Sequence, residues 1–254
     1  MTTRVGLIVP SSNTTIETEV PEMLRRRAAQ TGEQFTFHSS RAQLHQVDAE
    51  SLDRMVRDAD RCGAELTDAH VDILVYACLV AIMVRGQGAH REAEQRLADV
   101  AVANGAPAPV ISSAGALVRA LEAMGLRHVA LVTPYEPSLT DLVARYIEGC
   151  GVGVADTISL NVTENVAVAR LDQTKLIDHA KRLDLSAADG VVISCCVQMP
   201  SLNAIAQAEQ ALDLPVLSAA TATVYDLLTT LGRDPVVPDA GSLLSGNRIG
   251  AATS

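Results

Sequence analysis

The chain has 254 residues, 48% of them apolar, and a formal net charge of −10. This composition allows one large domain or two small lobes, and the acidic balance argues against nucleic acids and anionic membranes as partners. There is no apolar run of about 18 residues that would predict a membrane span, and no signal-peptide layout, so we expect a cytoplasmic protein.

In the first half of the chain, apolar runs of strand length alternate with helical periodicity. The segment 48–69 places apolar residues at three- and four-residue steps, which predicts a helix with one apolar stripe. The whole half reads as strand 4–10, helix 15–30, strand 34–40, helix 48–69, strand 71–79 and helix 90–105. This rhythm is typical of a parallel sheet covered by helices.

The pattern begins again near residue 127. "RHVALVTPYEPSLTDLV" mirrors "RVGLIVPSSNTTIETEV", and "ADGVVISCCVQMP" mirrors "VDILVYACLVAIM". Such a duplication predicts an α/β fold of two pseudo-symmetric lobes, each a parallel sheet flanked by helices, with the active site in the cleft between them. We place the second lobe at 113–217 and the first at 1–112 plus 218–254, because a helix at 218–232 is expected to return to the first lobe.

Four candidate segments lie at the carboxyl ends of the predicted strands. They are Pro10–Asn13, Cys78, Pro134–Tyr135 and Cys196. Ligands of parallel sheets bind beyond the carboxyl ends of the strands, so these four segments should line one cleft.

Two of the five cysteines occupy equivalent places in the two halves. Cys78 and Cys196 would set one thiol on each side of a bound molecule, which suits a nucleophile or base opposite a proton donor. We expect the backbone amides at strand ends to lower the pKa of these thiols. A buried cysteine is more often a small core hydrophobe, but the matched positions favour function for this pair.

The other cysteines and the histidines point to no disulfide or metal. Cys62 lies on the helical stripe, Cys150 lies in a turn, and Cys195 should face away from the cleft because successive strand residues alternate. No Cys-x-x-Cys pair occurs, and the six histidines have no metal-ligand spacing, so reduced thiols and no cofactor are expected.

Polar loops supply the remaining candidates. Ser11 and Asn13 lie in "PSSNTT", which caps a helix, holds a substrate carboxylate, or does both. Asn165 precedes another helix, where a cap is the simplest interpretation. The polar segment 39–50 is either an ordinary connection or a cover for the cleft, and "RGQGAHRE" has only a faint likeness to a phosphate loop.

Four segments together resemble a known family. "GLIVPSSNTTIETE", "VYACLVAIM", "VTPYEPSLTDLV" and "SCCVQMPSL" are similar to the maleate cis–trans isomerases, a branch of the aspartate/glutamate racemase superfamily, and the likeness runs from Val5 to about Leu228. It implies that Cys78 is the nucleophile, that Cys196 is the second family cysteine, and that Cys195 is extra. Arylmalonate decarboxylases of the superfamily keep only one of the two cysteines.

The resemblance also assigns the substrate-binding groups. It implies that Asn13 and Asn165 bind the substrate carboxylates and that Tyr135 donates its hydroxyl to the substrate. Backbone amides near Val80 and Val197–Gln198 would complete the binding of the carboxylates.

The implied reaction adds the Cys78 thiolate to C2 of maleate while the Cys196 thiol protonates C3, so that the succinyl adduct can rotate and release fumarate. One alternative is an amino-acid racemase that uses the same two thiols, although no acidic residue in the motifs would hold a substrate ammonium group. A second is a non-catalytic binding protein for small carboxylates, which leaves the paired thiols unexplained. The scarcity of charge on several helices predicts a homodimer.

Overall fold

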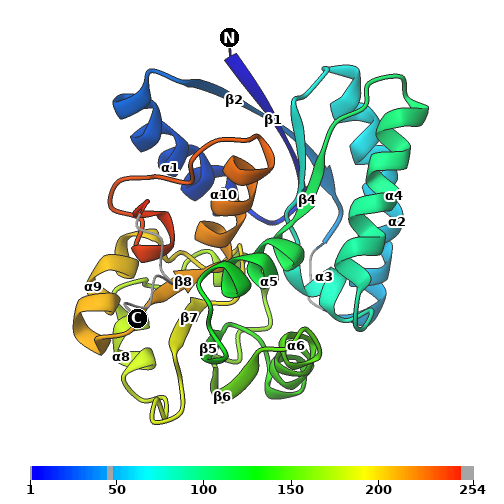
Figure 1. The fold of residues 1–254 in the computed structure, drawn as a ribbon. Helices are drawn as coiled ribbons and strands as arrows, with labels where there is room; N and C mark the ends of the chain where they lie inside the picture. Colours follow the sequence, from blue (N-terminus) through cyan, green and yellow to red (C-terminus); the bar gives the residue numbers. More distant parts are fainter. Residues whose placement is uncertain (1, 45–47, 247–254) are drawn as a thin grey trace.

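Two four-stranded parallel sheets, one from each half of the chain, form the framework of the molecule (Figure 1). The computed structural model describes residues 2–44 and 48–246. The strand order is β2-β1-β3-β4 in the first sheet and β6-β5-β7-β8 in the second, so the predicted duplication and fold class are confirmed. The strands are β1 (Thr2–Pro10), β2 (Gln34–Ala42), β3 (Ile73–Tyr76), β4 (Val110–Ser112), β5 (His128–Thr133), β6 (Gly153–Ser159), β7 (Gly190–Ser194) and β8 (Val216–Ser218).

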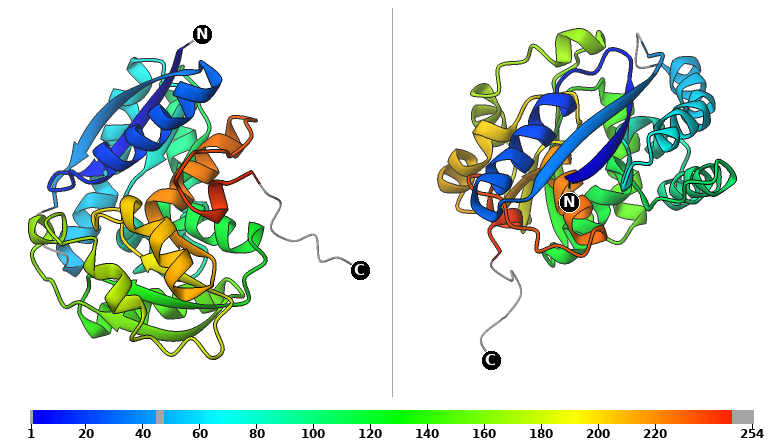
Figure 2. Two further views of the ribbon diagram at one scale, coloured as in Figure 1. Left: turned by 90° about the vertical axis from the view of Figure 1, so that its left-hand side faces the viewer. Right: turned by 90° about the horizontal axis from the view of Figure 1, so that it is seen from above.

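Helices cover both faces of the sheets. Seen from above, α1 lies on one face of the first sheet, with α2 and α4 on the other (Figure 2). The helices are α1 (Ile16–Thr31), α2 (Ala49–Asp68), α3 (Leu79–Met83), α4 (Ala89–Ala103), α5 (Ser113–Ala123), α6 (Pro137–Gly149), α7 (Asn165–Val168), α8 (Lys175–Ala180), α9 (Ile205–Leu212) and α10 (Ala219–Thr230), with short 3-10 helices η1 (Leu202–Ala204) and η2 (Ser242–Leu244). No helix in the described ranges is long and apolar enough to span a membrane.

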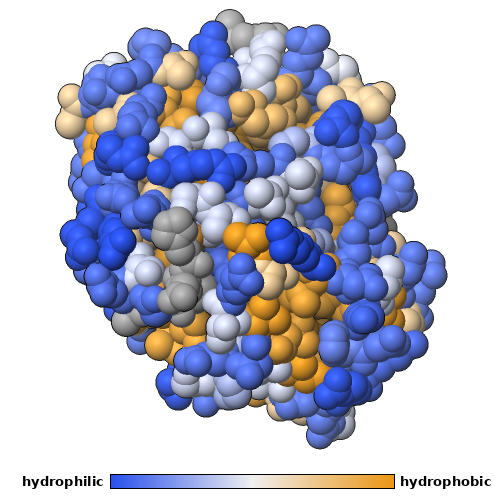
Figure 3. All heavy atoms as spheres, turned by 180° about the vertical axis from the view of Figure 1, so that it is seen from behind, coloured by the Kyte–Doolittle hydropathy of each residue, from blue (hydrophilic) through white to orange (hydrophobic). Residues whose placement is uncertain are grey.

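Burial explains the strand patterns. From Val5 onward β1 is buried on both faces, which a central strand of a covered parallel sheet requires. The edge strand β2 mixes exposed and buried residues instead. On the face seen in Figure 3, hydrophilic side chains cover most of the surface, and an apolar area remains in the lower half.

The predicted strand 71–79 is too long. β3 ends at Tyr76 and α3 begins at Leu79. The apolar run therefore contains a strand, a two-residue connection and a buried helix. Periodicity cannot separate these elements where every residue is buried on all sides. The early end of β3 leaves Cys78 at the junction of strand and helix.

Matching serines end the last strand of each sheet. Ser112 is the last residue of β4 and accepts a hydrogen bond from the N–H of Gly115, which caps α5. Ser218 is the last residue of β8 and forms a capping box with Thr221 at the start of α10. The two halves thus share their helix-start chemistry as well as their strand order.

The predicted helix 218–232 exists as α10 and packs against α1 and α5 (Figure 1). The division of the chain into lobes at residues 112 and 217 stays a prediction. Of the segment 39–50, residues 45–47 lie outside the described residues, while β2 extends to Ala42 and α2 begins at Ala49. Residues 247–254 of the predicted first lobe also lie outside the described part.

A charged cluster fastens α10 to the first half. The Arg119 guanidinium donates to both carboxylate oxygens of Asp226, at 2.8 and 2.7 Å, and also to Glu94 of α4. Asp226 is only 3% exposed. Burial raises the pKa of Asp226, against the opposing effect of Arg119.

We expect Arg119→Met to lower the free energy of unfolding by about 3 kcal/mol at pH 8, because the buried Asp226 carboxylate loses its main partner. Arg119 lowers the pKa of Asp226, so the variant should hold the Asp226 proton more tightly than the wild type; the deficit should therefore shrink at pH 5 and grow as the pH rises. Urea unfolding of both proteins at the two pH values measures this difference. Arg25→Met, in an exposed pair with Glu22, is the control and should cost less than about 0.5 kcal/mol. An equal loss for Arg119→Met at both pH values would show that Asp226 is not the cause.

Candidate active site

A small cavity lies where the carboxyl ends of the two sheets meet. It holds about 310 Å³ of empty space, mouth included, and its lining comes from both halves of the chain. Every predicted site residue except Ser11 belongs to this lining, which consists of Pro10, Asn13, Leu44, Ala77, Cys78, Leu79, Val80, Tyr135, Asn165, Cys196, Val197 and Gln198.

The cavity brings together the two thiols that the sequence singled out. Cys78 is 4% exposed and Cys196 is 7% exposed, and both line the same space. Each thiol also affects the other electrostatically, because a thiolate at Cys196 raises the pKa of Cys78. Two thiolates so close in a buried space oppose each other, so only one of them should be ionised at a time.

Cys78 lies at the N-terminus of α3, in extended backbone. Burial raises the pKa of its thiol to about 12, and the backbone N–H of Ala81 offsets this only in part. The expectation that strand-end amides lower this pKa is therefore wrong. Desolvation of a fully buried thiolate costs more than one N–H donor returns.

Cys196 has more hydrogen-bond partners than Cys78. The N–H of Gln198 donates to its sulfur at 3.4 Å, and the Tyr135 hydroxyl and the N–H of Met199 also favour its thiolate. Burial still raises its pKa, so Cys196 is a neutral thiol with a polar surround. The sequence-level interpretation gave Tyr135 to the substrate; in the structure its hydroxyl is hydrogen-bonded to the Cys196 thiol.

Asn13 offers a free donor to the cavity. Its Oδ1 accepts from the N–H of Ile16 and so caps the start of α1, while its Nδ2 is buried without a hydrogen-bond partner. A buried unpaired donor costs about 1–3 kcal/mol, and an anionic oxygen would satisfy it. The cap and the binding role proposed from the sequence thus use opposite ends of the same amide.

Gln198 joins the two halves beside the cavity. Its Oε1 accepts from the N–H of Thr14, and its Nε2 donates to the carbonyls of Ser12 and Asn165. The Nδ2 of Asn165 donates to the Ser12 hydroxyl at 2.6 Å. Both amide side chains therefore hold the site loops together, and the amide nitrogens of Gln198 and Asn165 already have partners.

The Ser11 side chain binds the backbone of Leu44. Its hydroxyl accepts from the N–H of Leu44, and the Ser12 hydroxyl donates to the carbonyl of the same residue. Leu44, which lines the cavity, was missed by the sequence analysis. It follows β2, so the rule that ligands bind at strand ends would have found it had the strand not been expected to stop at residue 40.

The remaining cysteines stay outside the cavity. Cys195 is fully buried and its N–H donates to Val132, so it continues the pairing of β7 with β5 and does not line the site. Cys62 lies in the core, and Cys150 is half-buried after α6. All five cysteines are free thiols.

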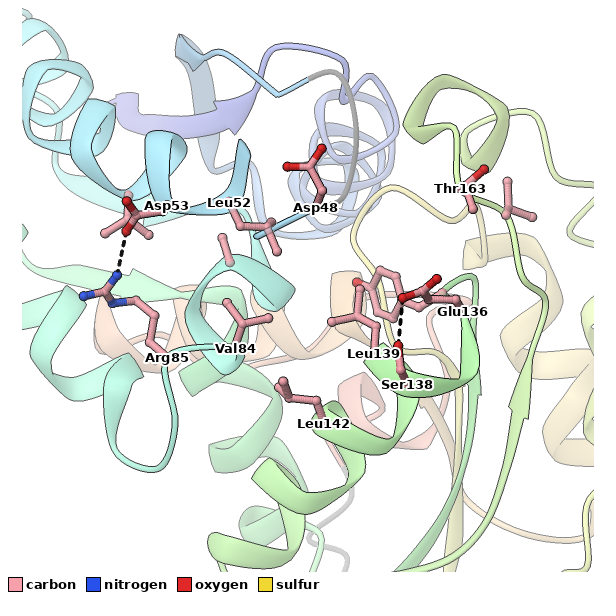
Figure 4. Close-up of a pocket in the computed structure, with 14 residues that line it drawn as sticks. Asp48, Leu52, Asp53, Val84, Arg85, Glu136, Ser138, Leu139, Leu142 and Thr163 are labelled. Atoms are coloured by element: carbon pink, nitrogen blue, oxygen red, sulfur yellow. Dashed lines mark hydrogen bonds and ion pairs between the residues drawn. The ribbon is translucent and has the colours of Figure 1, made fainter. Parts of the chain in front are cut away.

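A wider pocket opens beside the cavity and shares Tyr135 with it (Figure 4). It holds about 1680 Å³ of empty space between α2, α3 and α6, mouth included, and contains no cysteine. Its carboxylates, from Asp48, Asp53 and Glu136, outnumber its single cation, Arg85, which pairs with Asp53. This field repels anions. The smaller cavity, which no charged side chain of the described part of the chain lines, is the better site for an anion.

Comparison with known proteins gives one consistent result. The family model described as arylmalonate decarboxylase matches residues 5–244. The maleate isomerase of Geobacillus stearothermophilus is 52% identical, over 96% of this chain and 97% of that protein.

Solved structures agree. A variant of the maleate isomerase Iso from Pseudomonas putida S16, solved with maleate, is 47% identical with a TM-score of 0.96, covering 98% of this chain and 100% of that chain. A cysteine-to-serine variant of the Nocardia farcinica maleate cis-trans isomerase, solved with a covalently bound succinylcysteine intermediate, is 44% identical with a TM-score of 0.93, covering 96% of this chain and 98% of that chain.

The raised pKa of Cys78 predicts its alkylation profile. Only the thiolate reacts with iodoacetamide, so the logarithm of the Cys78 alkylation rate in the free protein should rise by about one for each pH unit from pH 7 to pH 10, without a plateau. Mass spectrometry of the Cys78 peptide measures the rate, and the unfolded protein, whose thiols should level off above about pH 9, is the reference. A plateau below pH 9 in the folded protein would contradict the pKa shift.

Proposed function

The chain belongs to the arylmalonate decarboxylase family, among relatives that are maleate isomerases, and from this premise we propose that it converts maleate to fumarate through a covalent succinyl-cysteine adduct. One observation of the structure carries the proposal. Two thiols from equivalent strand ends line one small cavity that also contains an unpaired amide donor.

The chemistry follows from the double bond. Rotation about C2–C3 of maleate is blocked until the π bond is broken, and addition of a nucleophile breaks it. The Cys78 sulfur forms a bond to C2, the π electrons move to C3, and C3 takes the proton of the Cys196 thiol. After rotation, the Cys196 thiolate removes a proton from C3, the C2–S bond breaks, and fumarate leaves with Cys78 as thiolate.

The different surroundings of the two thiols support these roles. Cys196 is held as a neutral thiol, and its hydrogen bonds from Tyr135 and Gln198 stabilise the thiolate that remains once it has given up its proton. Cys78 has only the N–H of Ala81, which leaves its sulfur less stabilised and more nucleophilic once ionised. Cys78 must give its proton to solvent before it attacks, so this step is the one that responds to pH.

Fixed dipoles would hold the substrate carboxylates. The free Nδ2 of Asn13 is the first donor available to a carboxylate oxygen. Backbone amides near Val80 and Val197 would donate further hydrogen bonds to the carboxylates. Asn165 would contribute after its Nδ2 exchanges its present partner, the Ser12 hydroxyl. Dipoles in a water-poor cavity bind an anion strongly even in an acidic protein, because long-range repulsion is screened by salt.

Two other activities fit less well. Arylmalonate decarboxylases keep only one of the two cysteines, whereas this chain has both. The relatives at about half identity are maleate isomerases. A racemase must hold a substrate ammonium group, and no carboxylate lines the cavity among the described residues.

Three further expectations stay predictions. The scheme needs no cofactor. Five free thiols support a reducing compartment such as the cytoplasm. The apolar area on the face of Figure 3 is of the kind found at subunit interfaces and supports a homodimer.

Replacing Cys78 with alanine removes the nucleophile. We expect Cys78→Ala to show no fumarate formation, measured by absorbance after mixing with maleate, and no succinyl adduct in the intact-protein mass spectrum. Cys62→Ala, a buried cysteine far from the cavity lining, is the matched control and should keep its activity. Turnover by Cys78→Ala near the wild-type rate would rule out the covalent scheme.

Replacing Cys196 with serine keeps the shape of the cavity but removes an acid of suitable strength. We expect Cys196→Ser to bind maleate and to lower kcat by about 10²- to 10⁴-fold, the usual contribution of a positioned acid–base group. Titration calorimetry and steady-state kinetics separate the two effects. A variant with unchanged kcat would show that Cys196 does not transfer the proton.

A further inference from the structure

The segment that carries Cys196 is held in place from outside its own half of the chain. It runs from Cys195 to Ser201, between β7 and η1, and has no regular secondary structure of its own. We propose that Glu19, on α1 of the first half, is the positioning residue that sets where the Cys196 sulfur lies in the cavity. This inference rests on the proposed function for its catalytic meaning, while the contacts that support it stand independently.

The contacts of Glu19 are specific. Its Oε1 accepts two backbone hydrogen bonds, from the N–H of Ser201 at 2.6 Å and from the N–H of Leu202 at 2.7 Å. Its Oε2 accepts from the Ser201 hydroxyl at 3.3 Å. The carboxylate thereby caps the start of η1, which continues into α9. These bonds join Glu19 to Ser201 and Leu202, which lie 182 and 183 positions further along the chain.

The contact between Glu19 and Ser201 is buried. Glu19 is 7% exposed and Ser201 is fully buried. Burial raises the pKa of Glu19, and the N–H groups of Leu202 and Ser201 oppose that rise. Because both backbone bonds end on the same oxygen, an uncharged amide of the same length could accept both. Reach, rather than charge, is the property that this position requires.

Three anchors define the path of the segment. Near its start, the Ser194 hydroxyl donates to the carbonyls of Cys196 and Met199. In the middle, Gln198 binds the backbone of Ser12 and Thr14 in the first half. Glu19 fixes the far end. Since the N–H of Gln198 donates to the Cys196 sulfur and the N–H of Met199 donates to the Cys196 carbonyl, loss of an anchor changes the surroundings of the thiol directly.

Glu19 therefore acts on Cys196 and not on Cys78. It lies on α1, which starts directly after the loop with Asn13, so one helix helps to place a substrate-binding group and the thiol of the opposite half. Cys78 lies between β3 and α3, whereas the side-chain hydrogen bonds of Glu19 go to Ser201 and Leu202. A loss of the Glu19 contact should separate the behaviour of the two cysteines.

Two substitutions distinguish reach from charge. Glu19→Gln keeps the length and loses the charge, whereas Glu19→Asp keeps the charge and is shorter by about 1.5 Å. We expect Glu19→Gln to keep kcat for maleate within about threefold. We expect Glu19→Asp to lower kcat by about 10- to 100-fold with a smaller change in KM, because a displacement of about 1 Å at a reacting group has effects of this size.

A second readout does not need turnover. With the N–H groups displaced, the Cys196 thiol of Glu19→Asp should ionise less readily, so its alkylation by iodoacetamide at pH 8 should slow several-fold, while that of Cys78 stays unchanged. Peptide mass spectrometry follows both cysteines in one sample. Glu22→Gln, an exposed carboxylate one turn further along α1, is the control and should alter neither rate.

The outcomes separate the hypotheses. Faster alkylation of both cysteines in Glu19→Asp would mean general loosening of the fold and would overturn the positioning role. Wild-type kcat with wild-type alkylation in Glu19→Asp would overturn it as well, and so would an effect of Glu19→Gln larger than that of Glu19→Asp. If the wild-type protein did not isomerise maleate, the proposed function would fail, while selective slowing at Cys196 would still support the positioning role.

Discussion

The site depends on the contact between the two halves of the chain at the carboxyl ends of their sheets. Each half supplies one thiol, and neither thiol has its counterpart without the other half. The side chains that bridge the halves, Gln198 and Glu19, are buried and hydrogen-bonded at each polar end. In a low-dielectric interior such bonds tolerate little displacement, so they define the spacing of the thiols more tightly than apolar packing alone would.

The cavity is electrically neutral although the protein is not. Within residues 2–44 and 48–246 no charged side chain lines it, and its polar groups are amides, a phenol, thiols and backbone N–H groups. An arginine would bind a dicarboxylate more strongly, but it would also stabilise thiolates and resist rotation of the bound chain. Burial raises the pKa of both thiols and keeps them protonated near neutral pH, which slows their oxidation and alkylation.

Pseudo-symmetry places the two cysteines alike, and the departures from symmetry give them different chemistry. Cys78 lies at the start of α3 with a single N–H donor, whereas Cys196 lies in an irregular segment with a phenol and two N–H groups around it. The second half is also longer between its strand and the helix that follows, which makes room for Gln198 and for the cap that Glu19 provides. A duplicated fold thus provides two equivalent positions, and local sequence gives the thiol at each position different surroundings.

The sequence by itself determined the duplicated α/β architecture and the two matched cysteines, because the alternation of apolar runs with helical periodicity is a local property. Only the tertiary structure decided what surrounds those residues. The chain alone did not predict the direction of the Cys78 pKa shift. Nor did it predict the hydrogen bond between Ser11 and Leu44 or the bridges made by Gln198 and Glu19. Desolvation depends on everything packed around a group, and these hydrogen bonds join residues distant in sequence, so neither is encoded in a local pattern.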